Sequence, residues 1–141
     1  MYSFARLHKY LPLPGGFIKE YTDKGVYGRF PNTEICIIKL PTNETEYNKV
    51  KAFINLLYTN RKSYKYNLRG VIFAAFNKQS SRKHKYYCSE FVRAALVKNS
   101  VLSDDALPQI TKPMDYYTKF CNNIIYTGKI SDYTTKIHHT M

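Results

Sequence analysis

Hydrophobic and polar positions alternate in several short stretches of the chain, and this pattern predicts strands. Tyr2–Arg6 alternates aromatic with small or polar side chains, which is typical of a half-buried strand. Residues 34–40 are rich in β-branched side chains and predict a short buried strand. Residues 123–127 predict another short strand. Near the N-terminus, turns are predicted at Pro12, Pro14, Gly15 and Gly16.

Apolar residues recur at helical spacing in two other stretches. Asn43 and Glu46 have the spacing of a capping box and predict the start of a helix. Its apolar positions are Tyr47, Val50, Ile54, Leu57 and Tyr58, and its solvent-facing positions are Lys49, Lys51 and Asn55. A second helix is predicted from Cys88 to about Lys98, because an apolar stripe begins at Cys88 and continues through Phe91, Val92, Ala95 and Leu96.

The remaining segments carry weaker patterns. The apolar run 68–76 fits a helix or a buried strand, and residues 77–85 predict a charged loop because none of them is apolar. Residues 99–113 are also expected to be loop, and the tail 131–141 is expected to fray because it shows no periodicity. With neither an internal repeat nor a linker, residues 1–141 are expected to form a single domain.

The composition narrows the class of protein. A chain of 141 residues with 44% hydrophobic and 23% charged residues is typical of a globular domain, which excludes disorder and fibrous repeats. No apolar run approaches the ~20 residues that span a bilayer, and no signal peptide is evident. Cys36, Cys88 and Cys121 lack the close spacing of a zinc or disulfide motif. We therefore expect a cytoplasmic protein with reduced thiols and no metal or cofactor.

The charge is strongly basic, with 22 Lys and Arg against 10 Asp and Glu, a net charge of +12. Residues 61–66 and 82–87 interleave cations with tyrosines, a pattern that suits phosphate contacts and base stacking. The same pattern also fits a solvated surface over packed tyrosines, and no helix-turn-helix, zinc-finger or RNA-recognition signature accompanies it. A basic module that binds nucleic acid or an anionic surface is therefore the alternative to an enzyme.

Cys88 is the residue whose position points to chemistry. A thiol attacks as thiolate, and the first turn of a helix favours that anion through its unpaired backbone N–H groups and positive dipole end. The same N–H groups can form an oxyanion hole for acyl transfer. Cys36 lacks this placement, because it lies within a β-branched run. The alternative for Cys88 is a small buried hydrophobe at the head of the stripe.

Residues 86–96, YYCSEFVRAAL, resemble the nucleophile helix of the circularly permuted, YiiX-like branch of the NlpC-type papain-like cysteine peptidases. Residues 2–20, YSFARLHKYLPLPGGFIKE, resemble segments of bacterial relatives, and the strands precede the Cys helix as in that branch. The resemblance implies an α+β fold with an antiparallel sheet packed on the nucleophile helix. It also implies a thiol hydrolase or acyltransferase with Cys88 as nucleophile, acting on an amide or ester of a peptide, cell-wall fragment or lipid acyl group.

The same resemblance places a general-base histidine on a strand just upstream, where this chain has only Met1. It therefore implies a domain incomplete at its N-terminus, either truncated or degenerate, with poor turnover unless another histidine substitutes. His8 and His84 are the candidate substitutes, and a solvated loop histidine is the alternative for each. His138 and His139 are expected to be exposed in the tail or to form a weak metal-binding pair.

Two polar residues near the predicted site are given structural roles. Ser3 lies beside the place of the missing histidine and is expected to be an exposed strand serine. Glu90 is expected to pair with Arg93 or to stabilise the helix dipole. The missing upstream strand would leave an exposed sheet edge, so the expected state is a monomer or an edge-strand dimer.

Overall fold

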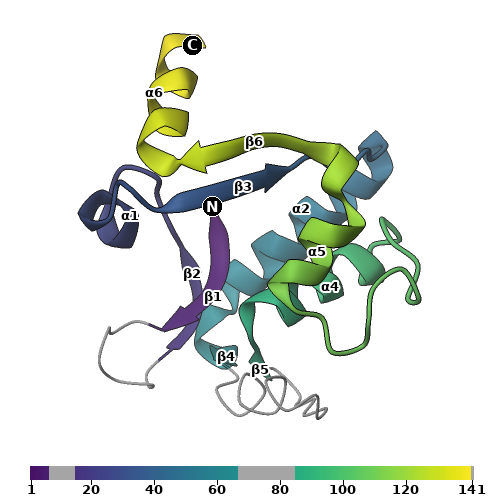
Figure 1. Cartoon of the computed structure of the whole chain (residues 1–141). Helices are drawn as coiled ribbons and strands as arrows, with labels where there is room; N and C mark the ends of the chain where they lie inside the picture. The colour runs from purple at the N-terminus through teal and green to yellow at the C-terminus, as the bar shows by residue number, and fades with distance from the viewer. Residues whose placement is uncertain (7–14, 67–84, 141) are drawn as a thin grey trace.

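The computed structural model describes the chain over residues 1–6, 15–66 and 85–140, with side chains described for 1–4, 15–65 and 86–135. The fold is of the α+β class, with two small sheets and several helices (Figure 1). The strands are β1 (Tyr2–Arg6), β2 (Gly15–Lys19), β3 (Glu34–Ile38), β4 (Lys65–Tyr66), β5 (Lys85–Tyr86) and β6 (Ile124–Lys129). The helices are α1 (Gly25–Arg29), α2 (Glu44–Thr59), α4 (Cys88–Lys98), α5 (Pro113–Lys119) and α6 (Ile130–Thr140), with 3₁₀ turns at Arg61–Ser63 and Cys121–Asn123.

The larger sheet has the order β1-β2-β4-β5. β1 pairs with β2 and β2 with β4 in antiparallel fashion, whereas β4 and β5 run parallel, so the expected all-antiparallel sheet is wrong at that pair. The turn predicted at Gly15 and Gly16 is also wrong, because both lie in β2 opposite the end of β1. A glycine suits position 16, where a Cβ atom would lie 3.1 Å from the carbonyl oxygen of Tyr64.

One face of this sheet packs on α4, as predicted for the Cys88 helix. Phe4 of β1 lies opposite Phe17 of β2, and both rings contact Phe91 of α4 at centroid distances of 5.3 and 5.1 Å. Leu57 of α2 and Ala95 of α4 complete the buried cluster. The spacing of the α4 stripe therefore brings Phe91 and Ala95 into the core and fixes the start of the helix beside the sheet.

Helix α2 confirms the capping-box prediction. The Glu46 backbone N–H donates to Asn43 Oδ1 at 2.8 Å, and the Asn43 N–H donates to Glu46 Oε2 at 3.0 Å. The predicted solvent positions Lys49, Lys51 and Asn55 are exposed. The prediction that Tyr47 belongs to the apolar face is wrong: Tyr47 is exposed, and the Lys51 ammonium lies 6.0 Å from its ring centroid.

The smaller sheet pairs β3 with β6 in antiparallel fashion. β3 begins at Glu34 as predicted, but it is not a buried strand, because each of its residues is exposed or half-buried. β6 confirms the late strand and extends past Gly128 to Lys129. Gly128 has φ of +150°, a conformation that glycine adopts without the Cβ penalty of other residues.

Two predictions about the C-terminal third are wrong. Residues 131–141 were expected to fray, but Ile130–Thr140 form α6, which extends beyond β6 (Figure 1). Ile130 is fully buried and the Tyr133 ring packs on Tyr126 at 5.0 Å, so this helix is anchored by tertiary contacts at its start. The expected loop at Pro113 is instead the first turn of α5, a position where proline is well tolerated.

Several predictions lie outside the described residues. They are the turns at Pro12 and Pro14, the apolar run 68–76 and all of the charged loop 77–85 except Lys85, which belongs to β5.

Candidate functional site

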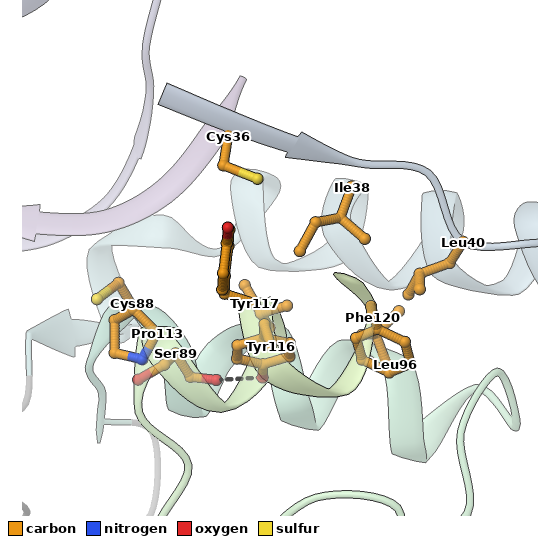
Figure 2. Close-up of a pocket in the computed structure, with 11 residues that line it drawn as sticks. Cys36, Ile38, Leu40, Cys88, Ser89, Leu96, Pro113, Tyr116, Tyr117 and Phe120 are labelled. Atoms are coloured by element: carbon orange, nitrogen blue, oxygen red, sulfur yellow. Dashed lines mark hydrogen bonds between the residues drawn. The ribbon is translucent and has the colours of Figure 1, made fainter. Parts of the chain in front are cut away.

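An open groove separates β3 from the helices α4 and α5 (Figure 2). Its volume is about 470 Å³, within the range of small-molecule sites. We call it the thiol groove because two cysteines line it. Its lining residues are Cys36, Ile38, Leu40, Cys88, Ser89, Val92, Leu96, Pro113, Tyr116, Tyr117 and Phe120.

Cys88 is the first residue of α4, following Tyr87 at the N-cap. The Tyr87 N–H donates to a Glu90 carboxylate oxygen at 3.3 Å, and its carbonyl accepts from the Phe91 N–H at 2.9 Å. These bonds define the first turn of α4, whose leading N–H groups have no acceptor within the helix. The Cys88 side chain is exposed, so the alternative of a buried hydrophobe is wrong. Cys88 is also one of the residues that line the thiol groove.

Two hydrogen bonds support the wall of the groove next to Cys88. Ser89 Oγ donates to the Thr111 carbonyl at 2.8 Å. Tyr116 Oη donates to the Ser89 carbonyl, also at 2.8 Å (Figure 2). Burial raises the pKa of Tyr116 well above its usual value. The pKa of Tyr87 is raised by its burial and, less, by the Glu90 and Cys88 anions. Both phenols are therefore protonated at neutral pH and are poor candidates for a general base.

Cys36 belongs to the site, although the sequence argument set it aside. Residues 36, 38 and 40 alternate along the chain and face the groove from the β3 side, where Cys36 is exposed (Figure 2). The period-two pattern was visible in the sequence. A run of β-branched residues predicts a buried strand, however, and does not indicate which face is open.

The candidate bases are not placed by the structure. His8 and His84 lie outside the described residues, and His138 and His139 belong to the α6 backbone without described side chains. Ser3 is half-buried rather than exposed, and its hydroxyl donates to Glu20 Oε2 at 2.6 Å, which supports its structural assignment.

The Glu90 assignment is also structural. Its carboxylate caps the start of α4 through the Tyr87 N–H, while Arg93 forms an ion pair with Asp104 at 2.9 Å. The hydrogen bond from Arg93 lowers the pKa of Asp104. The Arg93 guanidinium also donates to the Asp104 backbone carbonyl, so Arg93 binds the loop that follows α4.

Arg61 and Tyr86, one residue from each basic cluster, form contacts between a cation and a tyrosine within the chain. The Arg61 guanidinium lies 4.8 Å from the Tyr58 ring centroid, and Lys98 Nζ donates to Tyr86 Oη at 3.3 Å. Residues 82–84 of the second cluster lie outside the described part.

Across the described side chains, those of residues 1–4, 15–65 and 86–135, no three His, Cys, Asp or Glu residues gather as metal ligands. Within residues 1–6, 15–66 and 85–140 no helix has the length and apolarity needed to cross a bilayer.

Comparison of the chain with protein-family models, curated proteins and solved structures finds no match.

Proposed function

We propose that the protein is a thiol hydrolase or acyltransferase of the permuted papain-like kind, with Cys88 as its nucleophile. The observation that carries this proposal is the exposed Cys88 side chain at the first position of α4 and on the thiol groove. The order of elements supports it too, because β1 to β3 precede the Cys helix and β6 follows it.

In the proposed reaction the Cys88 thiolate attacks the carbonyl carbon of an amide or ester. A C–S bond forms, and the carbonyl π electrons move to oxygen. The N–H groups of the first turn of α4 stabilise the resulting oxyanion. Collapse of this intermediate breaks the C–N or C–O bond, and the leaving group departs with a proton. Water or another acceptor then attacks the thioester and regenerates the thiol.

The reaction also needs a group that accepts the thiol proton and later donates it. The described residues that line the thiol groove include no His, Asp, Glu or Lys, and burial raises the pKa of the lining Tyr116. We assign this role to a histidine. Without one at the site, the proposal predicts acylation of Cys88 but slow release.

Competitive alkylation tests the nucleophile assignment. Cys36, Cys88 and Cys121 are all exposed, so differences in access alone are reduced. With limiting iodoacetamide at about pH 6, Cys88 should be modified first, as expected of the nucleophile in the proposed reaction. Peptide mapping gives the three rates in one sample. Equal rates at the three cysteines would contradict the assignment.

The alternative function is a basic binding module, favoured by the net charge of +12. Affinity for single-stranded nucleic acid should then be high at low salt and fall steeply as salt is added. Absence of binding at low salt would eliminate this alternative.

A further inference from the structure

The wall of the thiol groove is strongly apolar. Ile38 and Leu40 line one side, Val92 and Leu96 line another, and Phe120 lies near Leu40 and Leu96 in Figure 2. None of the described residues that line the groove carries a charged side chain. An exposed groove of this composition is unfavourable in water and is stabilised when an apolar group covers it.

Two hydroxyl groups of the lining are bonded within the protein, whereas the Tyr117 hydroxyl points across the groove toward Cys36 (Figure 2). The Ser89 hydroxyl donates to the Thr111 carbonyl, and the Tyr116 hydroxyl donates to the Ser89 carbonyl. A peptide laid along this wall would bury amide groups that need hydrogen-bond partners there. A hydrocarbon chain has no such requirement.

Cys88 lies at one end of the lining residues, and Leu40, Leu96 and Phe120 lie at the other (Figure 2). In this view the Cys88 sulfur is directed away from the other lining residues. Because Cys88 lines the groove at that end, a substrate whose carbonyl carbon lies at Cys88 can place its hydrocarbon chain along the groove.

We propose that the thiol groove holds the hydrocarbon chain of a long-chain acyl ester or thioester, with the acyl carbonyl at Cys88. This inference rests on the proposed function. Attack by the Cys88 thiolate forms the new C–S bond and breaks the C–O or C–S bond to the leaving group. That group leaves with a proton, and the chain remains in the groove as the acyl part of a Cys88 thioester.

Chain length is the property that tests this proposal, because each buried methylene contributes a factor of about four in affinity. The probes are N-ethyl, N-octyl and N-benzyl iodoacetamide, which alkylate a thiol without needing a base for turnover. Every sample carries the substitution Cys36→Ser, because Cys36 lines the same groove as Cys88. Cys121 is the internal control, because it is exposed but does not line the groove.

The octyl-to-ethyl rate ratio should be at least about tenfold larger at Cys88 than at Cys121. Val92→Glu should remove this difference by placing a charge on the groove wall. Leu56→Glu is the matched control, because Leu56 is an exposed apolar residue of α2 outside the lining. It should leave the ratio unchanged, and circular dichroism should confirm that both variants are folded.

The outcomes distinguish failure of the acyl-chain proposal from failure of the assignment of Cys88 as nucleophile. Equal octyl-to-ethyl ratios at Cys88 and Cys121 would overturn the acyl-chain proposal, even if Cys88 remains the fastest thiol with the ethyl reagent. A benzyl reagent that outpaces the octyl one at Cys88 would overturn it too and indicate an aromatic side chain. Equal ethyl rates at Cys88 and Cys121 would instead contradict the nucleophile assignment.

Discussion

The Tyr116 hydroxyl of α5 donates to the backbone carbonyl of Ser89, the residue after Cys88, at 2.8 Å. This hydrogen bond joins α5 to the first turn of α4 across 27 residues of sequence. It holds the wall of the thiol groove against the turn that presents the Cys88 thiol. Stability and site geometry are therefore coupled at Tyr116.

Tyr116→Phe should lower the free energy of unfolding by about 1 kcal/mol, because the Ser89 carbonyl loses a hydrogen bond in a half-buried place. Urea unfolding followed by circular dichroism measures this change. Tyr117→Phe is the matched control, because Tyr117 is the exposed neighbour on the same helix. If the two variants lost the same stability, the hydrogen bond would not be the cause.

The pH dependence of stability should identify the same tyrosine. Burial raises the pKa of Tyr116 in the folded chain above the unfolded value of about 10. The contribution of the Tyr116 phenol to the free energy of unfolding is therefore complete below pH 10. It is lost as the pH rises from there toward the pKa of Tyr116 in the folded chain. The stability difference between the wild type and Tyr116→Phe should shrink above pH 10. A constant difference from pH 7 to 11 would argue against a buried, protonated phenol.

The capping box of α2 offers a prediction away from the site. Asn43→Ala removes the acceptor of the Glu46 N–H and should cost about 1 kcal/mol of stability. Asn55→Ala makes the same chemical change at an exposed interior position of α2 and should be neutral or slightly stabilising. Thermal or urea unfolding of both variants measures the contrast. Equal losses would show that the cap bond contributes nothing specific.

The contact of Phe91 in α4 with the sheet should make the largest contribution of the core to the free energy of unfolding. Phe91→Ala removes a buried ring that contacts Phe4 and Phe17 and should cost about 3–5 kcal/mol. Val92→Ala, at the next and more exposed position, should cost far less. If Phe91→Ala does not fold, the stability of Phe91→Leu is measured instead. A cost for Phe91→Leu no larger than for Val92→Ala would contradict this core.

Local signals in the sequence predict the two helices next to the site because those signals act within one turn. Asn43 and Glu46 bond to each other's backbone, so their spacing alone locates the start of α2. The spacing of the apolar positions after Cys88 likewise gives the bounds of α4.

The missed elements depend on partners distant in sequence. α6 begins at Ile130, which is buried by the tertiary fold and not by its own periodicity. α5 was not predicted from the sequence, because Pro113 is a residue typical of loops. In the structure the Asp115 carboxylate accepts a hydrogen bond from the Lys112 N–H and completes the first turn of the helix. Cys36 was missed for a related reason, because which face of β3 is open depends on where α4 and α5 lie.

The most direct measurement is the mass of the intact protein after incubation with an activated acetyl ester, with peptide mapping of the product. The account predicts one acetyl group per chain, bound as a thioester to Cys88 and removed by hydroxylamine. Cys88→Ser should abolish this adduct, and Cys121→Ser should leave it unchanged. Acetylation spread equally over Cys36, Cys88 and Cys121, or absent from Cys88, would contradict the account.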